Sequence, residues 1–222
     1  MQNNKIKIIY FDFDFWRVDI CRLTLSIAKI PYEYIRIPRK DWHKRKNTGE
    51  FNFGQLPAMI INEKKVAQTS AMARYCGKIS NLYPEDNFDS LLVDQILDVV
   101  NDVTLSISPS IREKNFDRKK EMRTNLNNTI LPKWLSYIEK FTSIYKKSEF
   151  IITRNFNIAD ITMWRFLLWL NCGLLEHIDT NLLKNYENLN KYFNYISTYK
   201  KLKQTNEYNE IIEGIKNRKL LM

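Results

Sequence analysis

The first third of the chain alternates short apolar runs with amphipathic segments. Apolar runs bounded by turn residues are typical of strands, and apolar positions three and four residues apart are typical of helices. The pattern predicts strands at 5–11, 32–37, 58–61 and 65–67, helices at 17–28 and 69–79, and a short polar helix or turn at 41–46. The order βαβ-α-ββα predicts an α/β domain, whose final hairpin turns at Asn62-Glu63.

Beyond residue 82 the pattern becomes helical throughout. A polar linker at 81–87 contains Pro84, which stops the preceding helix. Pro132 is expected to kink or split the helix that contains it, and Asn157 with Asp160 three residues later forms a variant of the capping box. The predicted helices lie at 89–107, 116–146, 157–171, 184–199 and 202–216. The sequence therefore predicts two domains, an α/β domain at 1–82 and an all-α helical bundle at 88–222.

Composition narrows the class of protein. The chain has 222 residues, of which 44% are apolar and 27% charged, as in ordinary globular domains. No apolar run approaches the roughly 18 residues of a membrane span, and the N-terminus lacks the apolar core of a signal peptide. Cys21, Cys76 and Cys172 are odd in number and form no Cys-x-x-Cys pair, which argues against a disulfide framework and favours a reducing, cytoplasmic compartment.

The net charge of +10 raises the question of nucleic-acid binding. Lys and Arg are spread along the chain, with dense patches at 36–46, 112–120 and 200–203, and none lies in a zinc-finger, RNA-recognition or helix-turn-helix context. A well-solvated basic surface explains this distribution better. We therefore expect neither nucleic acid nor a membrane as a partner.

Two short motifs, eleven residues apart from Pro57 to Gln68, carry the strongest indication of function. In Phe53-Gly54-Gln55-Leu56-Pro57 the chain turns at a proline and enters a strand, so that Leu56 can present its backbone to an extended ligand. In Gln68-Thr69-Ser70-Ala71 a strand runs directly into a helix with Thr69 expected at the N-cap, where free backbone N–H groups can hold an anion. Together they predict a surface that pairs with a peptide backbone and holds a carboxylate.

This pair of motifs resembles the glutathione-binding half of the cytosolic glutathione S-transferases, where it lies in a thioredoxin-like domain. Asn157-Ile158-Ala159-Asp160 is similar to the Ser/Thr-x-x-Asp sequence that opens the buried helix of the family's C-terminal bundle, and 131–135 is similar to a mid-bundle segment. The resemblance covers residues 5–199 and is closest to the tyrosine-type classes: sigma, mu, pi, alpha and the parasite enzymes near them. It implies an N-terminal thioredoxin-like domain and a C-terminal bundle with the hydrophobic-substrate site.

The chemistry of such an enzyme requires a thiolate. A cysteinyl thiol has a pKa of about 8.5, so most of it is protonated at neutral pH. A phenol O–H aimed at the sulfur stabilises the thiolate, and lowering the pKa by about two units takes about 3 kcal/mol. Tyr10 ends the first strand, where the family's catalytic tyrosine falls. The alternative interpretation is that Tyr10 is simply an aromatic residue of a strand.

The resemblance also implies a set of residues that bind glutathione. The Leu56 backbone pairs with the cysteinyl amide, Gln68 and Thr69 hold the γ-glutamyl carboxylate, and Lys46 faces the glycyl carboxylate. Trp42, Gln55 and Pro57 complete this set. Trp42 and Lys46 are four residues apart, as in the sigma class.

Asp94, Asp98 and Asp102 lie along one face of a predicted helix. Such a carboxylate row is usually a solvated face. The resemblance implies that Asp102 reaches across a homodimer interface to the amino group of the partner's glutathione. Some sigma-type enzymes bind a divalent ion through acids on this helix, but Asn101 stands where a third acid would be, so no metal is expected.

The segment after Tyr10 departs from the family. The family continues through an Arg-Gly pair, whereas residues 11–16 are one residue longer, contain no glycine and carry bulky aromatics. Phe13, Phe15, Trp16 and Arg17 are the predicted wall of the hydrophobic-substrate site, and Arg17 brings positive charge near the sulfur in a register that the sequence leaves open. The alternative is that Phe15 and Trp16 pack inward on the bundle.

Three classes of function stay open. The first is a transferase that conjugates glutathione, its co-substrate, to small hydrophobic electrophiles in detoxification. The second is a non-catalytic ligand-binding or interaction module of the same fold, and the third is a glutathione-dependent isomerase similar to prostaglandin D synthase. Tyr10 with Gln68-Thr69 favours the enzymes, and the altered loop favours the module.

Overall fold

Four strands form one mixed sheet in the computed structural model, which describes residues 4–220. The strands are β1 Ile6–Phe11, β2 Glu33–Ile37, β3 Ala58–Ile61 and β4 Lys64–Ala67. Their order is β2-β1-β3-β4, with β1 parallel to β2 and antiparallel to β3. Asn62 and Glu63 both have positive φ in the turn between β3 and β4, as a tight hairpin requires. The predicted strands and hairpin are confirmed.

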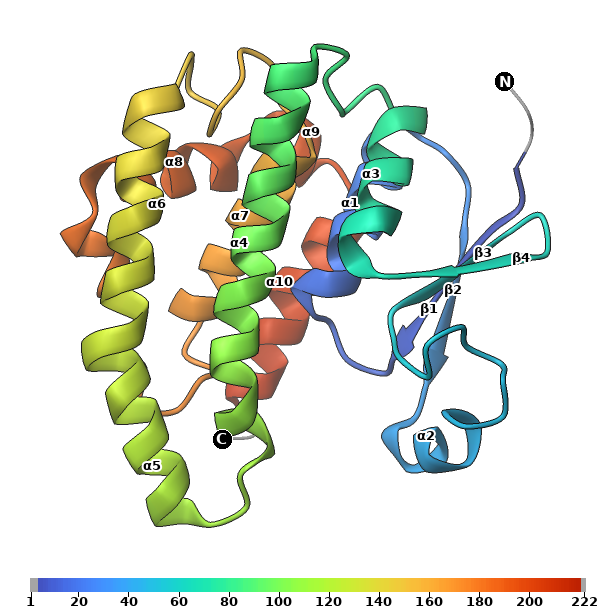
Figure 1. The fold of residues 1–222 in the computed structure, drawn as a ribbon, viewed down its shortest axis with the longest axis horizontal. Coiled ribbons are helices and arrows are strands. Elements are labelled where there is room, and N and C mark those ends of the chain that lie inside the picture. The colour runs from blue at the N-terminus through green and yellow to red at the C-terminus, as the bar shows by residue number, and fades with distance from the viewer. Residues whose placement is uncertain (1–3, 221–222) are drawn as a thin grey trace.

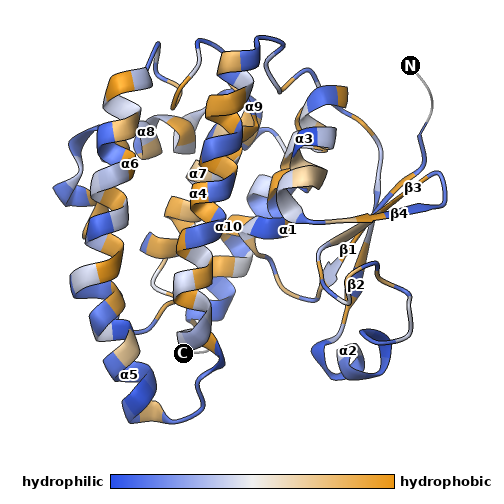
Figure 2. Cartoon of the chain, in the orientation of Figure 1, coloured by the Kyte–Doolittle hydropathy of each residue, from blue (hydrophilic) through white to orange (hydrophobic). Residues whose placement is uncertain are grey.

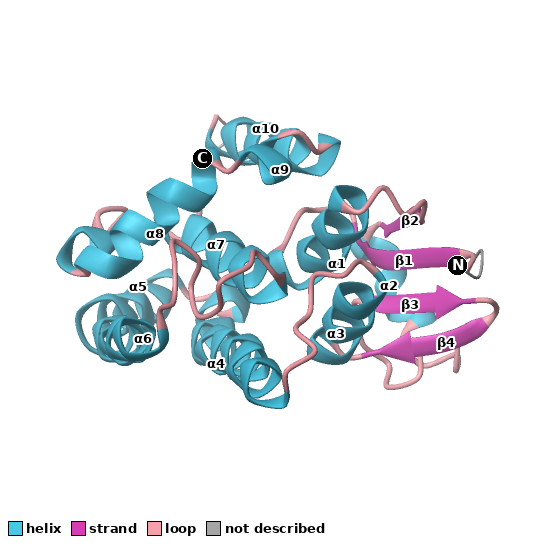
Figure 3. Cartoon of the chain, turned by 90° about the horizontal axis from the view of Figure 1, so that it is seen from above, coloured by secondary structure: helices cyan, strands magenta, loops and turns pink. Residues whose placement is uncertain are grey.

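Helices cover both faces of the sheet (Figure 1, Figure 3). Helices α1 Trp16–Ile27 and α3 Thr69–Ile79 lie between the sheet and the rest of the molecule, and α2 Arg39–Arg45 lies on the other face. The period-two alternation of β1 explains this arrangement. Ile8 and Tyr10 pack against α1 and α3, whereas Ile9 packs with Ile37 on the α2 side. Tyr10 therefore points toward the second half of the chain.

The remainder of the described chain is helical, as the sequence predicts. Its elements are α4 Asn87–Arg112, α5 Phe116–Asn125, a π-helical turn η1 Leu126–Ile130, α6 Leu131–Tyr145, α7 Ile158–Asn171, a 3₁₀ turn η2 Leu182–Asn185, α8 Glu187–Thr198, α9 Lys200–Lys203 and α10 Asn206–Lys219. None of the helices in residues 4–220 is long and apolar enough to cross a membrane. The thioredoxin-like and all-helical fold class is confirmed.

One helix prediction is borne out and another needs correction. The helix expected at 116–146 is interrupted by the π-helical turn, which lies directly before Pro132 in the first turn of α6. Pro132 has no N–H to donate to the preceding turn, and its ring crowds the carbonyl of Asn128, which belongs to the π-helical turn. The expected helix at 202–216 is two helices, because Thr205 caps α10 by accepting a hydrogen bond from the Tyr208 backbone N–H.

Helix α7 forms the centre of the bundle and is apolar around most of its circumference (Figure 2). The predicted capping box at its start is confirmed: Asn157 caps the first turn, and Asp160 returns a hydrogen bond to the Asn157 backbone N–H. Arg165 of α7 pairs with Asp19 of α1 at 2.8 Å in a fully buried contact. Because Trp16, Ile20 and Ala73 share their apolar core with the bundle, the division at 1–82 and 88–222 stays a prediction.

Candidate functional site

The sheet register brings three predicted site residues into one row. Ile9 lies opposite Ala58, and Ala58 lies opposite Ala67. One residue further along each strand, the row continues through Tyr10, Pro57 and Gln68. The Leu56–Pro57 peptide bond is cis. Residues from three separate parts of the sequence thus meet at one end of the sheet.

Tyr10 is the buried member of this row. Its side chain is 4% exposed, and its hydroxyl makes no hydrogen bond to any residue in 4–220. Burial raises the pKa of Tyr10, and the nearby Arg17 guanidinium opposes this shift more weakly. The phenol therefore keeps its proton at neutral pH. It is available as a hydrogen-bond donor to an anion such as a thiolate.

Arg17 has a defined position, which the sequence alone left open. It is the second residue of α1, and its guanidinium donates a 2.7 Å hydrogen bond to Asn101 Oδ1 on α4. The guanidinium also lies 4.9 Å from the centroid of the Trp16 ring. Burial lowers the pKa of Arg17, and Tyr10 is the group that opposes this shift. Asn101 therefore holds a positive charge close to the Tyr10 hydroxyl.

The strand-to-helix turn at Gln68 differs in one respect from the prediction. Thr69 is the first residue of α3 rather than its N-cap; Gln68 is the N-cap, and it makes no side-chain cap bond. Gln68 is exposed and has φ +73°, in the left-handed region that non-glycine residues seldom adopt. Thr69 is buried. The first backbone N–H groups of α3 lie at this exposed turn, where a helix offers them to an anion.

The loop between α2 and β3 places the other glutathione candidates. Trp42 packs edge-on against Phe11 at 5.4 Å and tilted against Phe51 at 5.4 Å. Gly54 has φ +57°, and a Cβ there would lie 3.0 Å from the Lys46 carbonyl oxygen. The loop therefore passes so close to the end of α2 that only glycine fits comfortably. Lys46 is half-buried, and Gln55 and Leu56 follow this close approach.

The aromatic loop after Tyr10 divides into two groups. Phe13 lies 5.6 Å from the Tyr10 ring and stacks on Phe11 at 5.6 Å, so it belongs to the site. Phe15 packs edge-on against Trp169 at 4.9 Å, and Trp16 is 1% exposed within the bundle core. The expectation that Trp16 forms an open wall is therefore corrected, since its ring is needed to fill the space between α1 and the bundle.

The carboxylate row on α4 has two members with partners in the same chain. Asp94 accepts hydrogen bonds from Arg74 Nε at 2.8 Å and from the Tyr83 hydroxyl at 3.0 Å. Asp98 accepts one from the Ser70 hydroxyl at 3.2 Å. Asp102 is exposed and makes no side-chain hydrogen bond within 4–220. The first two acids fasten α3 to α4, and Asp102 alone is left for a ligand or partner.

Sequence reasoning missed several residues around the site. Phe11, Phe51 and Asn101 position Trp42 and Arg17, and the Arg39 guanidinium lies 5.0 Å from the Phe13 ring centroid. The alternation of β1 signals only that Phe11 faces away from Tyr10. Within residues 4–220 no three His, Cys, Asp or Glu side chains lie close enough to hold a metal ion.

Family comparisons match both halves of the chain. The model of the N-terminal domain of glutathione S-transferases matches residues 6–78, and the model of the C-terminal domain matches residues 101–208. A glutathione S-transferase of Anopheles gambiae is 30% identical over 173 residues, which cover 76% of this chain and 79% of the relative.

Two further similarities bear on the alternatives. The structure of prostaglandin synthase D of Nilaparvata lugens matches with a TM-score of 0.77 and 26% identity, covering 90% of this chain and 95% of the other. S-crystallin SL11 of Nototodarus sloanii is 29% identical over 125 residues, which cover 56% of this chain and 60% of the crystallin.

Proposed function

Because the chain belongs to the glutathione S-transferase family, a family of transferases, we propose that it conjugates the thiolate of glutathione to small hydrophobic electrophiles, as a detoxification enzyme. The main support for this proposal is the state and position of Tyr10. The Tyr10 hydroxyl is protonated and is free of any hydrogen bond to residues 4–220, and Tyr10 lies one residue before the end of β1, in the row with Pro57 and Gln68. Tyr10 is the catalytic residue in this proposal.

The role of Tyr10 is to stabilise an anion rather than to remove the proton itself. The glutathione thiol releases its proton to solvent, and the Tyr10 O–H donates a hydrogen bond to the resulting sulfur anion. A hydrogen bond to a charged group stabilises it by about 1.5–3 kcal/mol. Arg17 adds positive charge nearby. The thiolate then attacks the electrophilic atom, and the displaced leaving group takes the bonding electron pair.

Glutathione lies, in this proposal, across the row of strand ends. The Leu56 backbone pairs with the cysteinyl amide, and Pro57 fixes the direction of that backbone. Gln68, Thr69 and the N–H groups of α3 hold the γ-glutamyl carboxylate. Trp42, Lys46 and Gln55 face the glycyl end, where the Lys46 ammonium is matched to a carboxylate.

We further propose a two-fold homodimer in which Asp102 reaches the amino group of the partner's glutathione. Two features of the chain support this proposal. Phe53 is 63% exposed on the loop before Pro57, and α4 and α6 leave an apolar groove of about 180 Å³ lined by Val99, Trp134 and Phe141. A two-fold axis lets each copy's Phe53 fill the other's groove. Exposed carboxylates such as Asp102 lie on the same helix, α4.

An isomerase similar to prostaglandin D synthase is the second candidate. It is favoured by Trp42 and Lys46, four residues apart, and by the likeness to the Nilaparvata lugens structure. Both reactions use the same activated thiolate, so product analysis with an endoperoxide and with a chloronitrobenzene separates them. A non-catalytic module is favoured by the aromatics beside Tyr10, and the absence of a thiolate from the bound state would support it.

A cytoplasmic location fits the cysteines. Cys21, Cys76 and Cys172 are all free, buried thiols, as in proteins of reducing compartments. The proposal needs glutathione as co-substrate and assigns no step to a metal ion. Phe13 and Arg17 form the wall of the hydrophobic-substrate site, with Phe15 behind them.

Retention on immobilised glutathione tests the binding half of the proposal. We expect the wild-type chain to be retained and to be eluted by free glutathione. Thr69→Ala should weaken retention because it removes a hydroxyl beside the helix N-terminus, and the control Thr198→Ala, at an exposed position in α8, should not. Equal retention of a folded Thr69→Ala protein would remove Thr69 from the site.

A further inference from the structure

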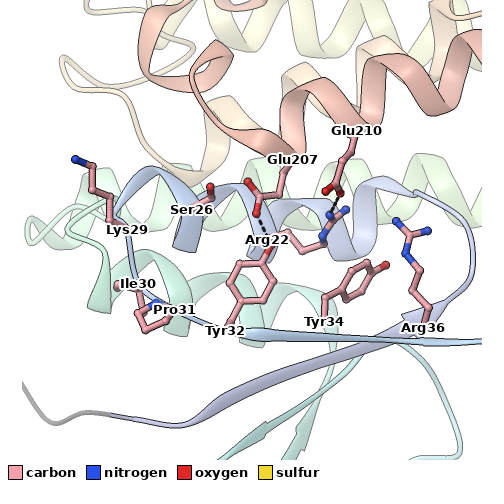
Figure 4. Close-up of a pocket in the computed structure, with 10 residues that line it drawn as sticks. All are labelled: Arg22, Ser26, Lys29, Ile30, Pro31, Tyr32, Tyr34, Arg36, Glu207 and Glu210. Atoms are coloured by element: carbon pink, nitrogen blue, oxygen red, sulfur yellow. Dashed lines mark hydrogen bonds and ion pairs between the residues drawn. The ribbon is translucent and has the colours of Figure 1, made fainter.

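A second hollow lies on the side of α1 that faces α10, away from the row of strand ends (Figure 4). It is a groove of about 560 Å³. Helix α1, the loop before β2, β2 itself and the first turns of α10 form its walls, and none of the residues proposed to bind glutathione lines it. Its volume lies in the range of sites for small organic molecules.

Three buried polar atoms without a partner gather in this groove. They are Arg22 Nε, the Tyr34 hydroxyl oxygen and Glu207 Oε2, none of which has a hydrogen-bond partner in the described chain. The Arg22 side chain is only 2% exposed. Buried polar groups in folded proteins are nearly always paired, because an unpaired one costs about 1–3 kcal/mol. Two donors and one acceptor left open at one groove indicate a missing ligand with complementary groups.

The side chains around these atoms are held in place. Arg22 pairs with Glu210 and, at 3.3 Å, with Asp19. Its guanidinium lies 4.3 Å from the centroid of the Tyr34 ring. The Tyr32 hydroxyl donates a 2.6 Å hydrogen bond to Glu207 Oε1, which leaves Oε2 of the same carboxylate open. The groove is therefore preformed, so little side-chain ordering opposes binding.

Charged groups of both signs line the groove. Helix α10 contributes the carboxylates of Glu207 and Glu210, and β2 contributes the Tyr34 hydroxyl and the Arg36 guanidinium (Figure 4). Arg22, which pairs with Glu210, and Lys29 add two further cations. Arg36 pairs with Asp14 through one nitrogen, which leaves its other N–H groups for a ligand. Burial raises the pKa of Tyr34, so its phenol is a donor at neutral pH. A ligand with a cation at one end and an anion at the other pairs most strongly with both Glu207 and Arg36.

We propose that this groove binds a small dipolar molecule with a free ammonium and a free carboxylate, of the class of amino acids and short peptides. The ammonium lies against Glu207 Oε2, and the carboxylate accepts from the Tyr34 hydroxyl and Arg36. The rings of Tyr32 and Tyr34 form the floor. Because α10 belongs to the helical half and β2 to the thioredoxin-like half, such a ligand bridges the two. The inference does not rest on the proposed transferase activity.

Calorimetric titration of the full chain with glycylglycine tests the proposal. We expect saturable binding to one site per chain, lost with N-acetylglycylglycine, which lacks the ammonium, and with glycylglycinamide, which lacks the carboxylate. Glu207→Gln keeps the acceptor for Tyr32 and removes the charge, so affinity should fall roughly 10- to 150-fold. Tyr34→Phe removes a donor to the ligand's charged carboxylate, so affinity should likewise fall roughly 10- to 150-fold.

A melting experiment distinguishes a ligand role for Tyr34 from a structural one. Without ligand, Tyr34→Phe should melt at the wild-type temperature or above it, because the variant removes an unpaired buried hydroxyl. The stabilisation by glycylglycine should shrink in the same variant. Gln68→Ala, in the proposed glutathione site, should bind the dipeptide as the wild type does. Binding abolished by Gln68→Ala, binding insensitive to both groove substitutions, or no binding at concentrations of about 10 mM would overturn the proposal.

Discussion

Asp160→Asn in the capping box of α7 tests the buried core of the helical half. Asp160 is fully buried; Oδ1 accepts from the Ile151 N–H at 2.8 Å and Oδ2 from the Asn157 N–H at 2.9 Å. Asparagine offers only one acceptor, so one backbone N–H would face an amide NH₂ group. An unsatisfied buried donor costs about 1–3 kcal/mol.

Denaturant unfolding measures this cost, and Asp86→Asn is the matched control. Asp86 caps α4 through an equivalent bond to the Asp89 N–H, but it is exposed, and asparagine caps a helix about as well as aspartate. We expect the control to lie within a few tenths of a kcal/mol of wild type. If Asp160→Asn lowers the free energy of unfolding by no more than Asp86→Asn does, the claim that a buried N–H is left without a partner is wrong.

The pH dependence provides a second, independent result. Burial raises the pKa of Asp160 to about 7, although its two backbone N–H donors act in the opposite direction. The folded state therefore binds more protons than the unfolded state between about pH 4 and pH 7, and stability falls as pH rises through this window, by at most about 1.4 kcal/mol per unit. Asp160→Asn cannot titrate, so its deficit relative to wild type should shrink toward pH 7. A constant deficit across the window would contradict the raised pKa.

Two further substitutions test the contact between the halves and the assembly. Arg165→Met leaves Asp19 buried with only Arg22 as a partner, so the free energy of unfolding should fall by about 3 kcal/mol in a denaturant assay. The Asp19→Asn/Arg165→Met double variant should recover part of this loss, and a double variant no more stable than Arg165→Met would argue against the ion pair. Phe53→Ser removes the side chain proposed to fill the partner's groove, so light scattering should show a 26.7 kDa monomer instead of a dimer. The control Phe116→Ser, at an equally exposed position on α5, should remain a dimer. If the Phe53→Ser protein is still a dimer, Phe53 is not part of the interface.

Structural features that depend only on residues close together in the sequence could be predicted from the sequence. The alternation of Ile8, Ile9 and Tyr10 predicts a strand with two different faces, and the structure places those faces against different helices. The capping box at Asn157 and Asp160 was also predicted correctly, because both of its hydrogen bonds span only a few residues. The cis Leu56–Pro57 bond lies within the loop motif that the sequence had singled out.

Contacts between residues far apart in the sequence could not be predicted from it. Arg17 is held by Asn101, 84 positions away, and Asp94 and Asp98 are used by Arg74, Tyr83 and Ser70. The sequence left open whether Trp16 lines the site or packs inward on the bundle, and in the structure its ring lies in the bundle core. Pro132 predicted an interruption of this helix, but the sequence did not predict its form, a π-helical turn at 126–130.

Titration of the thiolate absorbance of bound glutathione tests the central claim most directly, in wild type, in Tyr10→Phe and in the exposed control Tyr195→Phe on α8. Tyr10→Phe removes one O–H and leaves the ring, so a stabilisation of about 2–3 kcal/mol should appear as a thiol pKa about 1.5–2 units higher than in wild type. We expect a thiolate band near neutral pH in wild type and the control. The conjugation rate of Tyr10→Phe should fall roughly 30- to 150-fold near neutral pH. The same thiol titration in Tyr10→Phe and wild type would contradict the assignment of Tyr10.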